Sequence, residues 1–341
     1  MKIFVTGVDG YIGVMLAPLL QKHGHEVVCL DTGYYRDGCL YDGFDDLPSV
    51  HRVDLRKVKD SDLEGFDAVV HLAELSNDPL GQHNPAITYA INHGASVRLA
   101  KAAKRGGAKR FIYASSCSIY GAGNDEIKTE SSVPNPQTTY AECKVMVERD
   151  VSALADDDFS PTFMRNATAF GPSPRMRFDI VLNNLAGLAW TEKAIRMNGD
   201  GSAYRPLVHV LDICDAIVCA LEAPRDKIHN QIFNVGQDSD NYRVKEIAEI
   251  IQGVFPECGI EFGPAGADNR SYKVSFEKIR NVLGFTCKRN ATIGAIQLYA
   301  LFKKIDMTKD VFTFRAFTRL KQLEHLIKLG QLDDQLFWRA S

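Results

Sequence analysis

The first 170 residues alternate short apolar runs with segments whose apolar residues recur every three or four positions. Strand-like runs occur at 2–7, 25–31, 49–54, 67–73, 109–116 and 161–170, and helical spacing occurs between them at 11–24, 86–107 and 138–154. Short apolar runs are typical of parallel strands buried on both faces, and strands that alternate with helices indicate right-handed βαβ units. The pattern therefore predicts an α/β fold with a doubly wound parallel sheet.

The alternation changes after residue 171. Helical spacing at 178–190, 212–222 and 243–254 is interleaved with short strand-like runs near 194–197, 207–209 and 231–235. We interpret residues 1–171 as the main domain, to which later strands return, and residues 172–290 as a smaller, interleaved α/β lobe that binds the substrate. Residues 291–341 are expected to form a helical, amphipathic tail.

Composition and charge exclude several classes of function. Of the 341 residues, 45% are hydrophobic and 24% charged, which is ordinary for a soluble globular protein, and the net charge of −3 lacks the basic block of a nucleic-acid binder. The eight cysteines form no CxxC pair, so zinc sites are not expected and a reducing cytoplasm is favoured. The N-terminal apolar run is too short for a signal peptide, and no run approaches the roughly 20 residues of a membrane span.

The stretch TGVDGYIG at 6–13 places Gly7, Gly10 and Gly13 where a strand turns into a helix. In a dinucleotide-binding (Rossmann) turn the first glycine permits the turn, the second admits a pyrophosphate and the third packs helix against strand. A plain βα turn is the alternative, but Asp31 follows 18 positions beyond Gly13, where the acceptor for an adenine-ribose hydroxyl belongs. Asp31 would repel a 2′-phosphate, so the motif predicts NAD rather than NADP, although the nearby Arg36 leaves NADP open.

The sequence YAECK at 140–144 places a phenol and an ammonium on one helical face. A phenol with a pKa near 10 is a poor base at neutral pH, but a neighbouring ammonium and a cationic nicotinamide ring both favour the phenolate. Tyr140 could then take the proton of a sugar hydroxyl while the sugar carbon gives a hydride to NAD. The spacing alone is a common helical accident and gains its weight from the glycine motif and the strand at 109–116.

In this order the motifs resemble the extended short-chain dehydrogenase/reductases, specifically the nucleotide-sugar epimerase/dehydratase group. The resemblance spans about residues 1–290, and the tail shows no match. The matching segments are TGVDGYIG, Asp31, Asp54-Leu55, HLA at 71–73, 92–116, YAECK, RNATAFGP at 165–172, 198–216, FNVG at 233–236, and NRSY with LGF at 269–285.

The resemblance implies three groups of site residues. The cofactor would be bound by Gly7, Gly10, Tyr11, Ile12, Gly13, Asp31, Asp54, Leu55, Leu72, Ala73, Asn92, Tyr140 and Lys144. The reaction would be carried by Ser116, Tyr140 and Lys144. The substrate would be bound by Ser118, Thr168, Asn183, Arg205 and Arg270.

Within these groups the resemblance implies specific contacts. Asp54 and Leu55 would contact the adenine, Leu72 and Ala73 would line the ribose and phosphates, and Asn92 would brace the active-site helix. The two arginines would grip the nucleotide diphosphate through bidentate guanidinium groups. Family members often dimerise through a four-helix bundle that includes the Tyr/Lys helix, so a homodimer is expected by analogy.

The stretch YASSCSIYG at 113–121 could supply a nucleophile or only hold a substrate. No GxSxG motif supports a serine nucleophile, and the resemblance gives Ser116 and Ser118 a positioning role. Strand alternation points Cys117 away from them, so this thiol is expected to pack in the core. His71, His93 and His209 lack metal-ligand spacing, and His71 is expected to be structural; no metal site is predicted.

The residues after Ser116 discriminate among the reactions of the group. The 4,6-dehydratases carry an Asp-Glu pair where this chain has Cys117-Ser118, and the sugar-acid decarboxylases usually carry a glutamate at Ser118. The pattern SSCSIYG is instead similar to the SSSSVYG of the epimerases. The main hypothesis is therefore NAD-dependent epimerisation of a nucleotide-sugar through a transient ketone. The alternatives are a keto-sugar reductase and a non-catalytic NAD-binding sensor or scaffold, which the intact Ser116, Tyr140 and Lys144 argue against.

Three features depart from the pattern of the family. Glu74 follows HLA where a small residue is usual, which places a carboxylate near the site. Thr168 stands where many members have a diphosphate-binding Asn, with Asn166 two residues earlier. The loop PSPRMRFD at 172–179 is unusually basic, so Arg175 and Arg177 either contact an anionic group of the substrate or are solvated.

Overall fold

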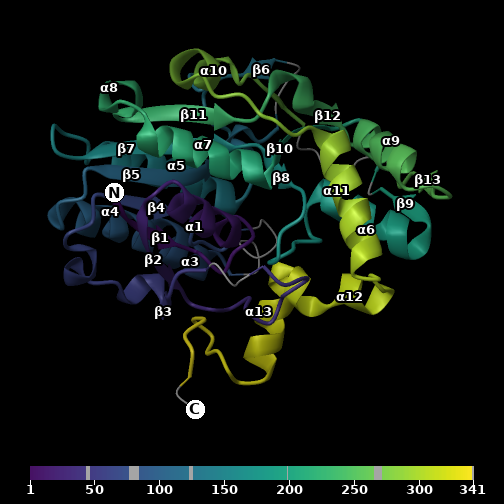
Figure 1. Ribbon diagram of the computed structural model, residues 1–341, viewed down its shortest axis with the longest axis horizontal. Coiled ribbons are helices and arrows are strands. Elements are labelled where there is room, and N and C mark those ends of the chain that lie inside the picture. The colour runs from purple at the N-terminus through teal and green to yellow at the C-terminus, as the bar shows by residue number, and fades with distance from the viewer. Residues whose placement is uncertain (44–46, 77–83, 123–125, 198, 265–270, 340–341) are drawn as a thin grey trace.

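The computed structural model describes residues 1–43, 47–76, 84–122, 126–197, 199–264 and 271–339 (Figure 1). Its centre is a seven-stranded sheet in the order β11-β7-β5-β4-β1-β2-β3, and every neighbouring pair is parallel. The strands are β1 (Lys2–Thr6), β2 (Glu26–Asp31), β3 (Val50–Arg52), β4 (Ala68–His71), β5 (Arg110–Ser116), β7 (Ser160–Asn166) and β11 (Gln231–Val235). This order confirms the predicted doubly wound α/β fold.

Helices cover both faces of this sheet, and each face has its own apolar core. Ile3, Val5 and Ile112 pack on the side of α1 (Gly13–Lys22) and α7 (Val210–Glu222). Phe4 and Phe111 belong to the core on the opposite side, with α4 (Ser96–Arg105) and α5 (Thr139–Ser152). Adjacent strand residues therefore contribute to different cores, as expected for strands buried on both faces.

Two predicted elements differ in the structure. The strand expected at 161–170 is divided, because the chain leaves the large sheet after Asn166 and β8 (Thr168–Phe170) pairs with β10 (Tyr204–His209). The helix expected at 86–107 consists of α3 (Pro85–Thr88), a π-helical segment η3 (Tyr89–Ala95) and α4. π-helical turns are rare and frequently mark functional sites.

Three short sheets and several further helices lie outside the seven-stranded sheet. The sheets are β12-β10-β8, β13-β9 and β14-β6. The remaining strands are β6 (Ile127–Lys128), β9 (Ala194–Arg196), β12 (Asn241–Arg243), β13 (Gly259–Glu261) and β14 (Lys273–Val274). The further helices are α6 (Val181–Glu192), α8 (Arg225–Ile228), α9 (Val244–Val254) and α10 (Glu277–Leu283). Among the helices that the structure describes, none is long and apolar enough to cross a membrane.

The tail is helical, as its pattern predicts, and it runs from the lobe back to the large sheet. It comprises α11 (Ala291–Lys304), α12 (Lys309–Thr313) and α13 (Arg319–Lys328). Figure 1 shows α11 beside α6, and α13 with the C-terminal segment below β3. Phe178 joins the tail to the lobe, because its ring lies 4.9 Å from that of Phe312 and 6.0 Å from that of Phe302, centroid to centroid.

We expect Phe302→Ala to lower the free energy of unfolding by about 3–5 kcal/mol, because the side chain is fully buried among these rings and its loss leaves a cavity. Urea denaturation followed by circular dichroism measures the change. Ile296→Ala on the same helix is the control: this side chain is 53% exposed, so its truncation should change stability by less than about 0.5 kcal/mol. An equal loss of unfolding free energy in the two variants would contradict a stabilising role for the aromatic contacts of Phe302.

Candidate functional site

A cleft of about 1500 Å³ lies at the carboxyl ends of β1, β2, β4 and β5. Its wall includes the turn between β1 and α1 that carries Gly7, Gly10 and Gly13, which we call the glycine turn. It also includes the ends of these strands, the start of α5 and residues of the smaller lobe. Ligands of doubly wound sheets bind at the carboxyl ends of the strands, where the strand order reverses. The volume exceeds the 300–1000 Å³ of a typical small-molecule pocket, so two ligands have room side by side.

At two glycines of the glycine turn, Gly7 and Gly13, there is no room for a side chain. Gly7 has φ +80°, and a Cβ built on it would lie 2.7 Å from the amide nitrogen of Ala73. A Cβ on Gly13 would lie 2.2 Å from the carbonyl oxygen of Gly7. Gly7 thus lies against the end of β4, and the start of α1 lies against Gly7. Gly10, Ile12 and the predicted contact residue Tyr11 line the cleft beside them. This is the backbone cradle that a pyrophosphate requires.

Asp31 ends β2 at the edge of the cleft, where the sequence places a ribose acceptor. Its carboxylate accepts hydrogen bonds from the backbone N–H of Gly33 at 2.7 Å and of Asp9 at 3.0 Å. Burial, followed by the nearby Asp9 carboxylate, raises the pKa of Asp31 to about 6. Asp9 in turn pairs with Arg52. Two carboxylates at this point disfavour a 2′-phosphate, which supports NAD over NADP.

Asp54 and Leu55, the predicted adenine contacts, also line the cleft. The Asp54 carboxylate is held by Arg56, whose Nη2 lies 2.7 Å from Oδ2 and whose Nε lies 2.9 Å from Oδ1. The C-terminal segment covers this pair from outside: Arg56 donates to the Gln335 carbonyl at 2.7 Å and stacks 3.6 Å from the centre of the Phe337 ring.

The same segment reaches the loop after β2. The Tyr34 hydroxyl donates to the carbonyl of Leu336 at 2.5 Å, and the Trp338 indole donates to the carbonyl of Thr32 at 2.7 Å. Tyr34 and Thr32 line the cleft beside Asp31. The tail therefore supports the wall at this end of the cleft, although it lies beyond the part of the chain that carries the family motifs.

Leu72 and Ala73 line the cleft at the end of β4, and their backbone N–H groups point to Oγ1 of Thr6 at 3.3 Å. Asn92, predicted with the cofactor residues, is fully buried in η3. Its amide group accepts from the N–H of Leu75 at 2.9 Å and donates to the Leu75 carbonyl at 3.0 Å. Asn92 thus holds the loop after β4, which carries the residues facing the cleft.

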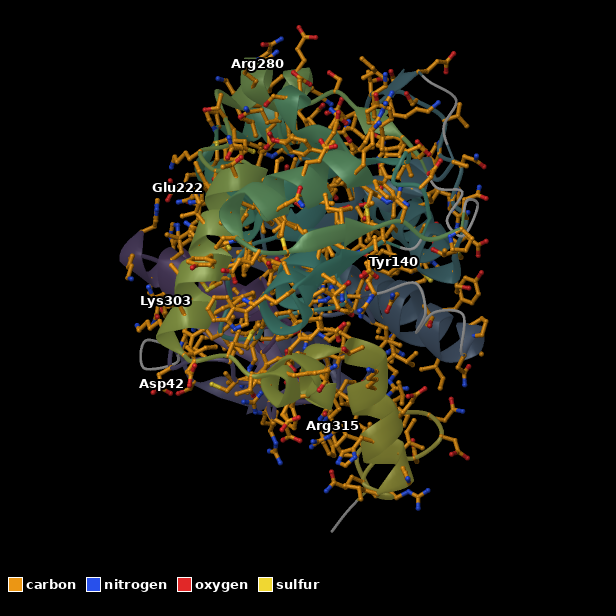
Figure 2. The ribbon with its side chains drawn as sticks, turned by 90° about the vertical axis from the view of Figure 1, so that its right-hand side faces the viewer. Asp42, Tyr140, Glu222, Arg280, Lys303 and Arg315 are labelled. Atoms are coloured by element: carbon orange, nitrogen blue, oxygen red, sulfur yellow. The ribbon has the colours of Figure 1, made fainter. Side chains whose placement is uncertain are left out.

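The three predicted catalytic residues gather in the cleft. Ser116 ends β5, and Tyr140 and Lys144 lie on the first turns of α5, which Thr138 caps by accepting from the N–H of Ala141 at 3.2 Å. The Lys144 ammonium lies 5.3 Å from the centre of the Tyr140 ring. In the view of Figure 2, Tyr140 lies between the green lobe above and the yellow tail helices below. A phenol and an ammonium therefore share one pocket, as the i, i+4 spacing predicts.

Glu74 makes the closest charged contact of Lys144. Its Oε2 lies 2.6 Å from Nζ of Lys144, and its Oε1 accepts from the Tyr113 hydroxyl at 2.6 Å. The side chains of Glu74 and Lys144 are only 3% and 5% exposed. Burial raises the pKa of Glu74, and Lys144 opposes the shift. The sequence placed a carboxylate near the site, and the structure shows that it forms an ion pair with the predicted catalytic lysine.

The other polar residues of the 113–121 stretch are divided between cleft and core. The backbone N–H of Ser118 donates to Oγ of Ser116 at 3.1 Å, and both serines line the cleft. Cys117 is buried, and its thiol donates to the Arg165 carbonyl at 3.1 Å, so the prediction of a packed thiol is confirmed.

Burial lowers the pKa of His71 to about 3, and its ring bridges Thr6 and Ser96, which confirms a structural role. No metal-binding cluster occurs among the described residues.

The predicted substrate residues have different environments. Thr168 and Arg205 line the cleft, as does Asn166. Asn183 is fully buried: it accepts from the N–H of Gly171 at 3.0 Å and donates to the Arg177 carbonyl at 3.1 Å, while the neighbouring Asn184 lines the cleft. Arg270 lies outside the described residues.

The basic loop at 172–179 contributes one arginine to the cleft. Arg177 pairs with Asp179 at 2.9 Å, and both side chains line the cleft. Arg175 instead turns to the backbone carbonyl of Arg36 at 2.6 Å.

Sequence reasoning missed a further part of the wall, which comprises Tyr35, Ser76, Asp179, Thr318, Arg319 and Leu320. Only the charge pattern of the loop pointed to Asp179, and no motif marked the tail residues.

Comparison with known proteins identifies relatives of matching architecture. The model of the NAD dependent epimerase/dehydratase family matches residues 3–236. The UDP-glucose 4-epimerase of Corynebacterium glutamicum is 28% identical over 312 residues, which cover 84% of this chain and 91% of that protein. A UDP-N-acetyl-alpha-D-glucosaminuronate decarboxylase of Bacillus cytotoxicus is 24% identical, over 73% of this chain and 79% of that protein.

Two solved structures share the fold of this chain. MoeE5 in complex with UDP-glucuronic acid and NAD superposes with a TM-score of 0.75 at 25% identity and covers 89% of this chain and 99% of its own. TunA, an NAD dependent NDP-hexosamine 5,6-dehydratase of tunicamycin biosynthesis, has a TM-score of 0.78 at 21% identity, over 90% of this chain and 99% of its own, which shows a shared fold.

We expect Gly13→Ala to weaken NAD binding at least tenfold, because the added methyl group meets the Gly7 carbonyl, which is backbone and can move only if the whole turn shifts. Isothermal titration calorimetry with NAD measures the change. Gly253→Ala in α9 is the control. Apart from its chain neighbours and the backbone of its own helix, no atom lies within 4 Å of the added methyl group, so NAD binding should be unchanged and stability slightly higher. Wild-type NAD affinity in Gly13→Ala would show that the turn does not hold the dinucleotide.

Proposed function

Because the chain belongs to the NAD dependent epimerase/dehydratase family, we propose that it epimerises a nucleotide-linked sugar through a transient keto-sugar, with NAD as its cofactor. The observation that carries the proposal is the gathering of Ser116, Tyr140 and Lys144 in one cleft with the glycine turn. A cleft of about 1500 Å³ accommodates a dinucleotide and a nucleotide-sugar together.

The residues present fit NAD. The backbone cradle between Gly7 and Gly13 suits the pyrophosphate, and the Asp31 carboxylate suits an adenine-ribose hydroxyl. Leu72 and Ala73 would line the ribose and phosphates, and Asp54 with Leu55 would contact the adenine. Asn92 would act indirectly, by holding the loop that ends at Leu75.

Tyr140 is proposed as the base that takes the proton of the reacting sugar hydroxyl. The Lys144 ammonium favours the phenolate form, and Ser116 would hydrogen-bond the same sugar oxygen and fix its position. NAD held at the glycine turn and Asp31 would supply the hydride acceptor for the sugar carbon and the hydride donor for the opposite face of the ketone. Tyr140 would then return its proton to the sugar oxygen, which becomes the new hydroxyl, so the protein ends the turnover as it began.

Epimerisation is favoured over elimination by the groups beside Ser116. A dehydratase of the 4,6 type needs an acid and a base at the two positions after Ser116. Here those positions hold Cys117, which is buried, and Ser118, which lines the cleft but whose hydroxyl oxygen is buried. A Cys-Ser pair cannot supply the two carboxyl groups of that elimination.

The identity of the substrate is proposed from relatives and lining residues. The curated 4-epimerases act on UDP-glucose, which supports a UDP-sugar inverted at C4. Arg205, with Arg270, would bind the diphosphate, and Ser118 and Thr168 would contact the sugar. Asn183 would act through the Gly171 and Arg177 backbone that it holds.

The lobe at 172–290 would then be the substrate-binding part of the chain. By analogy with the family, we also propose that the protein is a cytoplasmic homodimer.

A keto-sugar reductase remains the second candidate, since the same three residues serve it. The two differ in cofactor balance: an epimerase retains NAD and turns over without added NADH, whereas a reductase consumes one NADH for each product. Incubation of the purified protein with UDP-glucose and UDP-glucuronic acid, with and without NADH, distinguishes them by nucleotide-sugar chromatography.

We expect Tyr140→Phe to lose about 10²–10⁴-fold in turnover with unchanged NAD content, because the ring remains and only the proton acceptor is removed. Chromatography of the products and of released NAD measures both quantities. Tyr89→Phe is the control, since this tyrosine is 36% exposed and donates to Glu142. Unchanged turnover in Tyr140→Phe would rule out the proposed base.

NAD affinity is expected to fall as the pH decreases through about 6, where Asp31 takes up a proton and loses its charged acceptor oxygens. In the free protein the raised pKa has the opposite effect on stability: ionised Asp31 is unfavourable, so its contribution improves as the pH falls from about 6 towards 4. Asp31→Asn should weaken NAD binding about 10–100-fold at pH 8 and remove the pH dependence between 5 and 7. Calorimetric titration across this range tests it, and an unchanged pH dependence in the variant would contradict the assignment.

A further inference from the structure

Lys144 is enclosed by polar groups from the loop after β4 and from β5. Glu74, in the loop after β4, lies 2.6 Å from its Nζ, and the Ala114 carbonyl on β5 accepts from the same ammonium. The Tyr113 ring, also on β5, lies 4.5 Å from Nζ and its hydroxyl donates to Glu74. The ammonium is thus held at a fixed place beside Tyr140, and Glu74 contributes the carboxylate in direct contact with it.

Further titratable groups face this cluster. Tyr140 and Glu148 lie on α5, and His71 lies at the end of β4. Glu148 is already engaged by Arg165 at 2.6 Å, while Arg177 faces Tyr140 from the loop at 172–179. Burial acts to lower the pKa of Lys144, but Glu74 and Tyr140 outweigh it and the pKa is raised. A bound nicotinamide cation would add positive charge, which makes a counter-ion more necessary.

We propose that Glu74 is a positioning residue that keeps Lys144 protonated and aimed at Tyr140, and so sets the pH range of the reaction. The proposal rests on the proposed function, because it assigns Glu74 a role through the lysine and the tyrosine of that site. Glu74 acts through Lys144 and is not itself required to touch the sugar.

The consequence is a shift of the whole pH profile. A negative charge raises the pKa of every neighbouring group, so its removal lowers the pKa of both Tyr140 and Lys144. Turnover needs the tyrosine deprotonated and the lysine protonated, which gives an acidic limb and an alkaline limb. Loss of the Glu74 charge therefore moves both limbs to lower pH, whereas a purely structural defect would lower the rate at every pH without moving either limb.

The first test compares pH–rate profiles of the full-length holoenzyme. Glu74→Gln keeps the shape of the side chain and an acceptor oxygen for the Tyr113 hydroxyl but removes the charge. Both limbs are expected to move by about one pH unit or more to acid. Glu74→Asp restores the charge and should return the limbs towards their original positions. Glu142→Gln is the matched control, because this carboxylate lies on α5 with Lys144 but accepts a hydrogen bond from the Tyr89 hydroxyl. The pH–rate profile of this variant should not move.

The second test does not need turnover. Lysines labelled with ¹³C at the ε-carbon are titrated by NMR in the wild type and in Glu74→Gln, with Lys144→Met to identify the signal. The Lys144 signal should titrate at lower pH in Glu74→Gln and unchanged in Glu142→Gln. An unmoved titration, or an active Glu74→Gln variant with unmoved limbs, would overturn the proposal. Absence of turnover with every nucleotide-sugar would overturn the proposed function alone, since the NMR titration still reports on Glu74.

Discussion

The close approach of the glycine turn to the end of β4 is the contact on which the sheet and the cleft both depend. β1 lies between β4 and β2, and the chain crosses from β3 to the other side of β1 to form β4. The crevice at this switch point is where the cleft opens. Because Gly7 meets the backbone of Ala73 and Gly13 meets the backbone of Gly7, no side-chain rotation could relieve a larger residue there.

Much of this arrangement follows from local pattern. The apolar strands, the glycine turn and the shared helical face of Tyr140 and Lys144 depend on neighbouring residues, so the sequence predicts them well. The end of the sixth strand does not: Asn166 pairs in the large sheet and Thr168 in the small one, and the partner Leu207 is distant in sequence. The sequence does not predict the π-helical segment for a similar reason, because its Asn92 accepts a hydrogen bond from Leu75 in a separate loop.

In the candidate site, too, the sequence predicts residues from their local pattern but not the contacts that they make with distant parts of the chain. A carboxylate near the site was foreseen at Glu74, but its partner depends on how the loop after β4 meets α5. The burial of Asn183, next to a cleft-lining Asn184, depends on which side of α6 faces Gly171. The contacts of Gln335 and Trp338 with Arg56 and Thr32 join the ends of the chain, and the family motifs do not extend that far.

Paired charges around the cleft bear on how one tyrosine could serve both halves of an epimerisation. In the proposed reaction, Tyr140 would accept a proton while the nicotinamide is cationic and would return it when the ring is neutral. A lone buried ammonium would favour the phenolate equally in both halves and so oppose the return of the proton. With Glu74 at 2.6 Å, much of the field of Lys144 is compensated, and the changing charge of the nicotinamide becomes the larger influence on the phenol. The ion pair would thus let the proton affinity of Tyr140 follow the redox state of the cofactor, which a reversible exchange requires.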